Sequence, residues 1–269
     1  MSHQNTGFTG SIPENYDRYL GPLWFEPYAQ DIAGRVSVPD DGAVLELACG
    51  TGIVTRRLRE RLPANVRLVA TDLNEPMIAF AKRKFTEQER IEWKQADMTE
   101  LSFDDEFFDA VVCQFGIMFV PDKQRVFQEV LRVLKPGCSF LFNVWDSMDH
   151  NDLARVTHQT IVKAFPADPP RFFEIPYGFN DREAITAMLE NAGFQRIEFD
   201  VLKFPSVASS AAEISNGLIK GTPVFGAINE RGPGYADRIQ AAVAEEIANQ
   251  LGDNPVSCSI QAVVFEATK

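Results

Sequence analysis

Short apolar segments alternate with amphipathic segments between Ala43 and Trp145, and this alternation constrains the fold more than any other feature. Apolar segments of strand length are predicted at 43–48, 66–71, 91–96, 108–115 and 139–145, with helices at 51–62, 75–88 and 122–134. Strands that are apolar on both sides are typical of a parallel sheet covered by helices on both faces. The sequence therefore predicts an α/β protein with a doubly wound sheet, which binds ligands at the carboxyl ends of its strands.

The flanking segments set the predicted domain organisation. Residues 1–40 are predicted to form an N-terminal helical segment, in which Gly21-Pro22 breaks the helix. Two further strands, at 196–204 and 257–267, bring the mostly parallel sheet to seven strands. The predicted ligand-binding domain comprises 41–204 and 257–269, and the predicted cap comprises 205–256 with a helix at 235–251. The cap is inferred because this stretch is too long for a hairpin turn.

Composition narrows the classes of partner. The 269 residues carry a net charge of −12, and a surface that acidic repels phosphate backbones, so no nucleic-acid partner is expected. No apolar run approaches the roughly 20 residues that cross a bilayer, and residues 1–11 lack a signal-peptide core, so a cytoplasmic protein is expected. The four cysteines lack metal-ligand spacing and are interpreted as reduced core residues, so no metal site is predicted. A homodimer is compatible with these observations.

A glycine turn follows the first predicted strand, in the segment Val44-Leu45-Glu46-Leu47-Ala48-Cys49-Gly50-Thr51-Gly52. Glycine allows the backbone to approach a ligand closely and to adopt a positive φ. The helix that follows presents free N–H groups to a negative or polar ligand group. Alone, a turn of this kind is weak evidence for nucleotide binding.

Acidic residues at the ends of the next two strands strengthen that interpretation. Asp72 lies 72 − 50 = 22 residues after Gly50, where a carboxylate can accept hydrogen bonds from both hydroxyls of a ribose. Asp97 follows the third strand and can accept a hydrogen bond from the amino group of adenine, while the adjacent backbone N–H reads a ring nitrogen. Each aspartate alone could be a helix cap or a loop residue, but the pair favours an adenosine site.

Two rival nucleotide sites fit the turn poorly. A dinucleotide fingerprint requires a third glycine, and Thr55 occupies that position. Glu46 is a poor neighbour for a pyrophosphate and suits the cationic amino group of a methionine moiety better. A phosphate-binding P-loop is excluded because no Lys-Ser or Lys-Thr pair follows the glycines. An NAD-dependent oxidoreductase therefore stays a distant alternative.

Several motifs in order resemble the class I S-adenosylmethionine-dependent methyltransferases, especially the group related to the ubiquinone and menaquinone biosynthesis C-methyltransferases. They are Glu46 to Gly52, Asp72, Asp97-Met98, Phe108 to Val112 and Val133 to Gly137, and the resemblance covers about residues 16–145. Ala48 departs from the pattern, since many members have the first glycine of the loop there. The resemblance implies a Rossmann-like enzyme that transfers the methyl group of S-adenosylmethionine to an acceptor and releases S-adenosylhomocysteine.

The resemblance also implies which residues bind the cofactor. Gly50 and Gly52 flank the methionine part with Glu46 and Ala48 in support, and Asp72 holds the ribose. The other implied residues are Leu73, Met77, Asp97 and Met98 around the adenine, Gln114 and Phe115 near the sulfonium, and Tyr16 and Tyr19 closing over the cofactor. Simple packing is the alternative for the two tyrosines.

An apolar, aromatic wall is predicted for the acceptor pocket, which suits a small planar or lipid-like molecule. Its predicted residues are Tyr16, Met118, Phe119, Trp145, Phe172, Phe173 and Tyr177, together with Phe115 and Phe179, although each could equally be ordinary core. His150 is the candidate general base if the acceptor must lose a proton, with an exposed loop histidine as the alternative. A protein or peptide methyltransferase and a non-catalytic cofactor-binding module are the alternative functions. The element that accepts the methyl group stays open.

Overall fold

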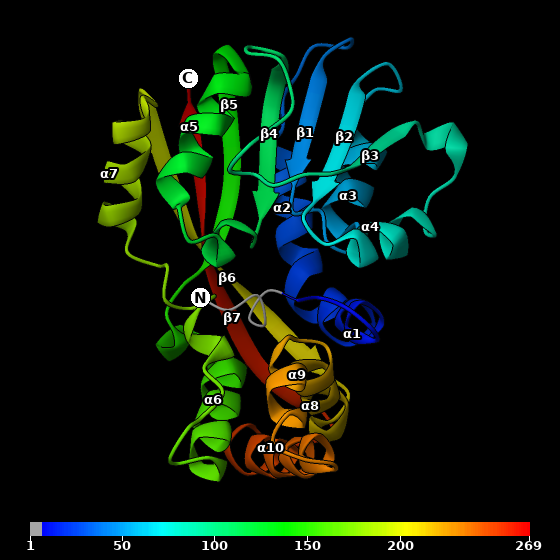
Figure 1. Ribbon diagram of the computed structural model, residues 1–269, viewed down its shortest axis with the longest axis vertical. Coiled ribbons are helices and arrows are strands. Elements are labelled where there is room, and N and C mark those ends of the chain that lie inside the picture. The colour runs from blue at the N-terminus through cyan, green and yellow to red at the C-terminus, as the bar shows by residue number, and fades with distance from the viewer. Residues whose placement is uncertain (1–6) are drawn as a thin grey trace. The chain divides into compact units, whose positions relative to one another are not determined.

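The computed structural model describes residues 7–269. These residues contain one seven-stranded sheet and the helices around it (Figure 1). Its strands are β1 (Ala43–Leu47), β2 (Arg67–Asp72), β3 (Ile91–Gln95), β4 (Phe108–Gln114), β5 (Leu134–Trp145), β6 (Arg196–Ala208) and β7 (Val256–Thr268). They lie in the order β3-β2-β1-β4-β5-β7-β6. The first five strands pair in parallel, and β7 runs antiparallel to β5. The prediction of a doubly wound, mostly parallel seven-stranded sheet is confirmed.

Helices separate most of the strands along the chain. They are α1 (Ile12–Asn15), the π-helix η2 (Tyr16–Phe25), α2 (Glu26–Arg35), α3 (Ile53–Arg61), α4 (Glu75–Lys82), α5 (Lys123–Val133), α6 (Asp152–Ala164), α7 (Arg182–Ala192), α8 (Ala211–Lys220), α9 (Val224–Asn229) and α10 (Tyr235–Leu251). Short 3₁₀ turns are η3 (Glu87–Glu89), η4 (Ile117–Phe119), η5 (Met148–His150) and η6 (Phe172–Glu174).

The described chain divides into two compact units. The sheet unit comprises Tyr28–Trp145, Phe179–Leu202 and Ala262–Lys269. The helical unit comprises residues 7–27, Asp146–Gly178 and Lys203–Gln261. The boundaries predicted at 1–40, 41–204, 205–256 and 257–269 stay predictions, and residues 1–6 of the predicted N-terminal segment lie outside the described range.

One face of the sheet packs against α2 and α3. Because side chains alternate between the faces of a strand, Val44, Leu68 and Val112 point to the same side. There they form a continuous core with Ile32 of α2 and Leu58 of α3, all of them buried. The alternate residues of β1 and β4 are buried as well, and burial on both faces explains why these strands are apolar runs rather than alternating ones.

The opposite face of β5 packs against α5. Phe127 of α5 has its ring centroid 6.4 Å from that of Phe140 and 5.7 Å from that of Phe142, while Leu141 between them belongs to the other core. All four side chains are almost fully buried, and each contributes about 1.5–3 kcal/mol through the apolar surface that it removes from water. Figure 1 shows α5 lying across the front of this part of the sheet.

The prediction that Gly21-Pro22 breaks the first helix is wrong. The backbone continues through both residues as the π-helix η2, at whose end the N–H of Glu26 donates to the carbonyl of Gly21, five residues earlier. In an α-helix, Pro22 would lack a donor and would clash with the carbonyl four residues before it. The wider π-turn accommodates the proline and lets α2 follow directly.

Two other predicted boundaries shift. The helix predicted to end at Gln88 ends at Lys82, and residues 87–89 form a separate 3₁₀ turn. The fifth strand begins at Leu134 rather than Ser139, because Leu134 already pairs with Phe108 and a bulge absorbs the extra residues. The Lys135-Pro136-Gly137 segment therefore ends α5 and lies within the strand.

The helical unit is held together by close helix contacts. An added Cβ at Gly217 of α8 would lie 2.6 Å from the Cβ of Tyr19, so glycine allows α8 to pack tightly on η2. The helix predicted at 235–251 is confirmed as α10, which buries Ile239, Val243 and Ile247. Within residues 7–269, no helix is long and apolar enough to cross a membrane.

Candidate functional site

The turn after β1 has the backbone geometry that its glycines predict. Gly50 and Gly52 have φ values of 55° and 81°, and Ala48 has a φ of 52°. An added Cβ at Gly50 would meet no heavy atom closer than 4.0 Å, so this side of the turn is open to a close ligand. An added Cβ at Gly52 would lie 3.0 Å from Phe85, so glycine allows close packing there, and its role beside the methionine part stays a prediction.

Asp72, at the end of β2, braces the glycine turn. Its Oδ2 accepts a hydrogen bond from the main-chain N–H of Gly50 at 2.9 Å, and its Oδ1 accepts one from that of Asn74 at 2.8 Å. Only 7% of Asp72 is exposed, and burial raises the pKa of its carboxyl. The structure therefore brings Gly50 and Asp72 together, and it fixes the carboxylate orientation before any ligand binds.

Glu46 is a second buried carboxyl beneath the same turn. Its Oε2 accepts a hydrogen bond from the hydroxyl of Thr55 at 2.6 Å, and 2% of the residue is exposed. Burial, with a smaller contribution from the charge of Asp72, raises the pKa of Glu46 to about 8. An approaching cation would stabilise the carboxylate and oppose that shift. Thr55, which replaces a glycine of the dinucleotide pattern, thus has a role that the sequence did not reveal.

Thr51 adds a polar group to the turn. Its hydroxyl is buried, and no hydrogen-bond partner is present among the described residues. A buried polar group without a partner is costly, and such groups in a native protein often mark a ligand or water position. With the open side of Gly50 and the acidic Glu46, the turn fits a ligand that carries a cationic amino group.

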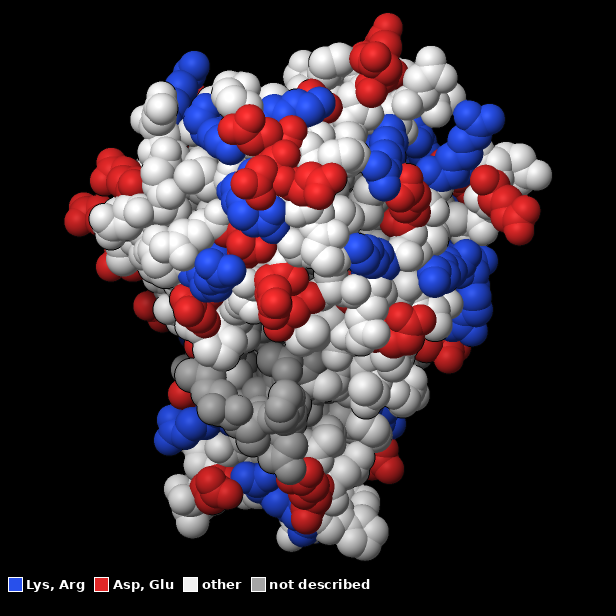
Figure 2. Space-filling view, turned by 45° about the horizontal axis from the view of Figure 1, so that its top comes forward, with Lys and Arg blue, Asp and Glu red and all other residues white. Residues whose placement is uncertain are grey.

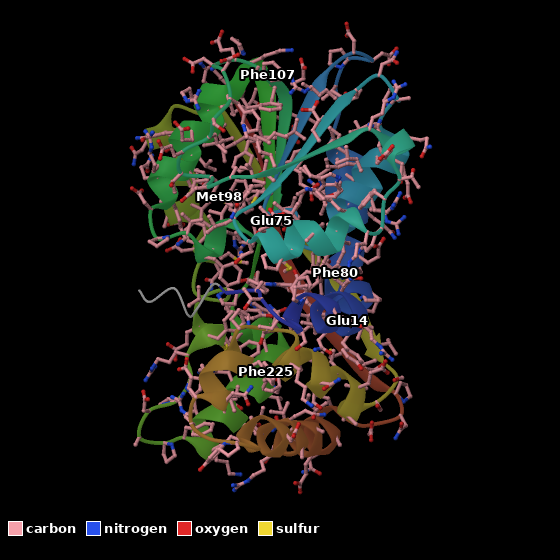
Figure 3. The ribbon with its side chains drawn as sticks, turned by 45° about the vertical axis from the view of Figure 1, so that its right-hand side comes forward. Glu14, Glu75, Phe80, Met98, Phe107 and Phe225 are labelled. Atoms are coloured by element: carbon pink, nitrogen blue, oxygen red, sulfur yellow. The ribbon has the colours of Figure 1, made fainter. Side chains whose placement is uncertain are left out.

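The ends of β2 and β3 lie next to each other beside the turn. The N–H of Ala96 donates to the carbonyl of Asp72 at 3.1 Å. Asp97 is exposed, and Thr99 directs both its N–H and its hydroxyl to Oδ1, at 2.8 and 2.7 Å. Oδ2 takes part in neither bond. Met98, in the loop after β3, is partly buried and lies at this edge of the sheet unit (Figure 3).

An exposed apolar side chain adjoins these carboxylates. Leu73 is 54% exposed although it is a large hydrophobic residue, and Gln95 fixes its backbone by donating to its carbonyl at 2.8 Å. Met77, one helical turn into α4, is buried. An apolar surface next to polar acceptors suits a purine ring, which is flat and carries donors at its edge.

The turn after β4 packs against the glycine turn. Phe115 has a φ of 52°, a conformation that costs a non-glycine residue about 1–3 kcal/mol. An added Cβ at Gly116 would lie 2.5 Å from the Cβ of Ala48, so the two turns are in close contact. Gln114, predicted to lie near the sulfonium, occupies the last position of β4 and is partly buried.

An aromatic cluster supports this second turn from within the sheet unit. The ring of Phe115 stacks on that of Trp145, with centroids 3.9 Å apart and planes 7° apart. Tyr28 packs edge-on against both rings and donates its hydroxyl to the carbonyl of Leu202 at 3.2 Å. The Sδ of Met118 accepts a hydrogen bond from the N–H of Trp145 at 3.4 Å. Sequence reasoning placed Tyr28 in an aromatic N-terminal segment but gave it no role in the site; it lies near the start of α2.

Asn143 is another residue that sequence reasoning missed. It is fully buried in β5, and its Oδ1 accepts a hydrogen bond from the N–H of Phe115 at 3.0 Å. One signal was available: a single amide inside an apolar strand has to find a partner, because an unpaired buried amide is costly.

Most of the remaining residues predicted around the cofactor and the acceptor belong to the helical unit. Tyr16 stacks on Phe25 with ring centroids 4.5 Å apart, and Arg18 lies over the ring of Tyr19 at 5.1 Å. Three aromatic residues of the segment after α6 are buried, namely Phe172, Phe173 and Tyr177. Phe119, in the sheet unit, is partly buried. Their roles in substrate binding stay predictions.

His150 is exposed at the end of η5, after the strand that carries Trp145. Asp146, in contrast, is buried, and its two oxygens accept from the N–H of Ser147 and the side-chain amide of Gln261, each at 2.8 Å. Asp146 therefore has a structural role at this position. The proposed role of His150 as a general base stays a prediction.

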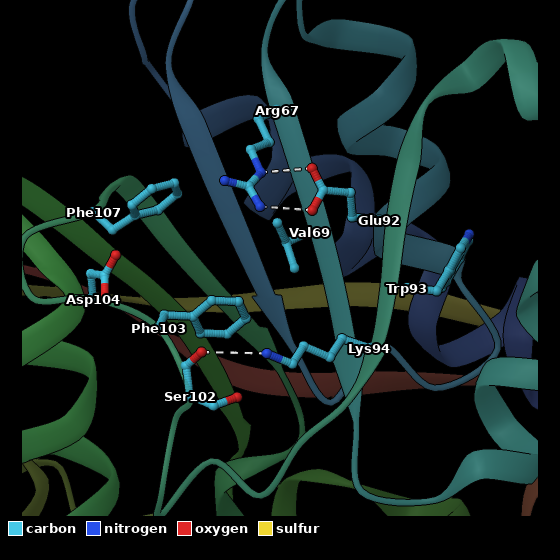
Figure 4. A pocket seen from close by; sticks show the side chains of 9 residues that line it. All are labelled: Arg67, Val69, Glu92, Trp93, Lys94, Ser102, Phe103, Asp104 and Phe107. Atoms are coloured by element: carbon cyan, nitrogen blue, oxygen red, sulfur yellow. Dashed lines mark hydrogen bonds and ion pairs between the residues drawn. The ribbon is translucent and has the colours of Figure 1, made fainter.

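A hollow of about 350 Å³ lies at the other end of β2 (Figure 4). Arg67 there forms two hydrogen bonds with Glu92, at 2.6 and 2.8 Å, and Lys94 donates to the carbonyl of Ser102 at 3.3 Å. Since Arg67 begins β2 and Asp72 ends it, this hollow is separate from the glycine turn.

Charged side chains of both signs are interspersed on the face shown in Figure 2. Among residues 7–269, no group of three or more His, Cys, Asp or Glu side chains is arranged to hold a metal ion. The glycine turn, with the buried carboxyls of Glu46 and Asp72 beside it, is therefore the candidate functional site.

Comparisons with known proteins agree with this location. Residues 44–137 match a family model described as a methyltransferase domain. The chain is 26% identical to a demethylmenaquinone methyltransferase of Lactiplantibacillus plantarum over 223 residues, which cover 77% of this chain and 94% of that protein.

Solved structures share the fold. A putative methyltransferase from Bacillus halodurans superposes with a TM-score of 0.56 at 18% identity, covering 90% of this chain and 98% of that one. Phosphoethanolamine N-methyltransferase 2 of Haemonchus contortus, in complex with S-adenosyl-L-methionine, gives a TM-score of 0.63 at 16% identity, covering 100% of this chain and 60% of that one. At these identities the likeness shows the fold alone.

Proposed function

This chain belongs to the class I S-adenosylmethionine-dependent methyltransferases, and from that premise we propose that its methyl acceptor is a small apolar or aromatic molecule of the quinol type. The single observation that carries the cofactor site is the bond between Asp72 and the N–H of Gly50. It joins two of the residues that the sequence assigns to ribose and methionine binding. The acceptor class is supported by the name of the Lactiplantibacillus relative and by the aromatic residues near the strand ends.

The residues of the turn fit the cofactor's chemical groups. Asp72 would accept from the ribose hydroxyls, and its fixed orientation lowers the ordering cost of binding. Glu46 would face the amino group of the methionine moiety, and Leu73 would cover the adenine. Asp97 and the backbone N–H of Met98 would form hydrogen bonds with the edge of the adenine ring.

The bound cofactor supplies a methyl group already activated by the positive charge on its sulfur. The protein's contribution is then to align the acceptor with that methyl group and to keep water away. Transfer would convert the cofactor into S-adenosylhomocysteine, and a quinol-type acceptor would give up one proton for the methyl group that it gains. His150, exposed beside the end of β5, is the proposed base where that proton must be removed.

Methyl transfer from labelled S-adenosylmethionine to a panel of acceptors tests the proposal. The panel contains a reduced naphthoquinone that lacks its ring methyl group, simple phenols, a primary amine and a peptide mixture. We expect S-adenosylhomocysteine release with the naphthoquinol. The Asp72→Ala variant serves as the control, because weaker cofactor binding should reduce turnover with every acceptor alike.

Two results would replace this proposal by its alternatives. Turnover with the peptide mixture and with none of the small aromatics would indicate a protein or peptide methyltransferase. Cofactor binding without product from any acceptor class would indicate a non-catalytic binding module.

A further inference from the structure

Asn143 is the one amide in the apolar second half of β5, between the buried Phe142 and Val144. None of its surface is exposed to solvent. A buried amide is retained at such a position only when its hydrogen bonds are made, since a same-sized apolar side chain would pack there without that requirement. The bonds that it makes therefore indicate its role.

Both ends of the Asn143 side chain bind the turn after β4. Oδ1 accepts from the N–H of Phe115 at 3.0 Å, and the main-chain carbonyl of Asn143 accepts from the same N–H at 3.2 Å. Nδ2 donates to Oε1 of Gln114 at 3.3 Å. One side chain thus fixes the main chain of Phe115 at its positive φ and the side-chain orientation of Gln114.

This turn is in direct contact with the cofactor site. Leu47, the last residue of β1, is in register with Cys113 of β4. Gly116 lies so close to Ala48 that a Cβ there would be 2.5 Å away from the Cβ of Ala48. A shift of the β4 turn would therefore displace the glycine turn.

We propose that Asn143 is a positioning residue for methyl transfer. It holds Gln114 and Phe115 at the end of β4 so that their oxygen atoms face the sulfur of the bound cofactor. This inference rests on the proposed function, together with the resemblance-based expectation that Gln114 and Phe115 lie near the sulfonium.

The charge on sulfur makes the proposal measurable without an acceptor. S-adenosylmethionine carries a positively charged sulfonium, whereas S-adenosylhomocysteine carries a neutral thioether. Oriented oxygen atoms favour the cation, and they lose that preference when their orientation is lost. A merely structural residue would instead weaken the binding of both molecules equally.

Calorimetric titration of the full chain with each of the two molecules tests this. In Asn143→Leu, which removes both side-chain bonds and keeps the strand apolar, we expect the preference for S-adenosylmethionine over S-adenosylhomocysteine to fall by about tenfold, the size of one lost hydrogen bond. Gln114→Leu, on a partly exposed residue, should reduce the same ratio.

Two further variants serve as controls. Asn143→Asp, as a neutral buried carboxyl, keeps an acceptor for Phe115 and a donor for Gln114, and should restore most of the ratio. Ser139→Ala lies in the middle of the same strand, four residues before Asn143, and removes a hydrogen bond of 3.0 Å to Glu266. It should leave the ratio unchanged.

The outcomes separate the two proposals. The positioning role would be overturned if Asn143→Leu weakened the binding of both molecules equally. It would also be overturned if the affinity ratio stayed unchanged both in Gln114→Leu and in a folded Asn143→Leu. Either result would leave the proposed function standing. Failure of the wild-type chain to bind either molecule would overturn the proposed function itself.

Discussion

The turn after β1 and the turn after β4 are built alike, yet the first has an open side and the second is tightly packed. Each contains a non-glycine residue at positive φ, Ala48 in the first and Phe115 in the second, and each is fixed by a side chain from a neighbouring strand. Asp72 binds the first turn and Asn143 binds the second. However, a Cβ added at Gly50 would meet open space, whereas one added at Gly116 would overlap Ala48.

This difference separates binding from support. The first turn keeps an open side for a ligand and carries ionisable groups, while the second is packed against the first and carries neutral amides. The carboxylate of Asp72 holds the first turn and can also accept hydrogen bonds from a ligand. The amide of Asn143 holds the second turn without placing a charge in the buried sheet. The predictions below test that division, beginning with the largest expected effect.

Filling the contact between the turns should have the largest effect. Gly116→Ala is expected to destabilise the protein by about 3 kcal/mol, because the new Cβ would overlap Ala48 and the sulfur of Cys113. Gly137→Ala is the matched control: its φ is 76° but nothing lies within 4 Å, so only backbone strain of about 1 kcal/mol is expected. Urea unfolding measures both, and equal losses would mean that the turns do not pack together.

Removing the carboxylate brace should mainly affect ligand binding. Asp72→Ala is expected to weaken S-adenosylmethionine binding by about 1–3 kcal/mol, since a buried acceptor for the ribose and for Gly50 is lost. Asp104→Ala, on an exposed residue in the loop before β4, should change the affinity by less than about 0.5 kcal/mol. Calorimetry that finds Asp72→Ala as tight as the wild type would contradict the ribose assignment.

The first turn was predictable because its geometry follows from the sheet. Parallel strands β1, β2 and β3 end at one edge, so residues that follow them must converge there, as Gly50 and Asp72 do. The sheet class followed from the same alternation of apolar runs. No long-range pairing had to be guessed for these residues.

The supporting residues were not predictable, because their roles depend on pairings between distant strands. Asn143 acquires its meaning only once β5 is known to lie beside β4, and Thr55 only once α3 is folded over Glu46. The π-helix through Gly21-Pro22 was missed because local rules treat this dipeptide as a break. The acceptor residues come from irregular segments without periodicity, where a sequence pattern carries little information.

Acidity should weaken ligand binding at the first turn through Glu46. With a pKa of about 8 in the folded protein, this carboxyl is mostly protonated at pH 7 and becomes a carboxylate above pH 8. A cationic amino group prefers the carboxylate, so affinity for S-adenosylmethionine should rise by up to about tenfold from pH 6 to pH 7, below the pH of about 8 at which an α-amino group loses its own proton. Calorimetry across this range on the wild type and on Glu46→Gln provides the measurement, and equal slopes in the two proteins would exclude Glu46.

The same shift predicts the opposite trend for stability. Because the folded-state pKa of Glu46 is raised above its unfolded value of 4.5, the folded state holds the proton more tightly. Its contribution to stability is therefore largest below pH 4.5 and falls as the pH rises toward 8. In urea unfolding, the Glu46→Gln variant should lack this pH-dependent part of the free energy of unfolding. Ionisation of Glu46 thus raises ligand affinity and lowers stability.

Relieving the strain at Ala48 should have the smallest effect. Ala48→Gly removes a positive-φ penalty of about 1 kcal/mol but adds a similar conformational entropy to the unfolded chain, so the net change should be within about 0.5 kcal/mol. Ala43→Gly in β1, where no such strain exists, should instead cost about 1 kcal/mol. If both variants lost the same stability by urea unfolding, Ala48 would not be strained. Near-neutrality at Ala48 would explain how this turn forms without a glycine at that position.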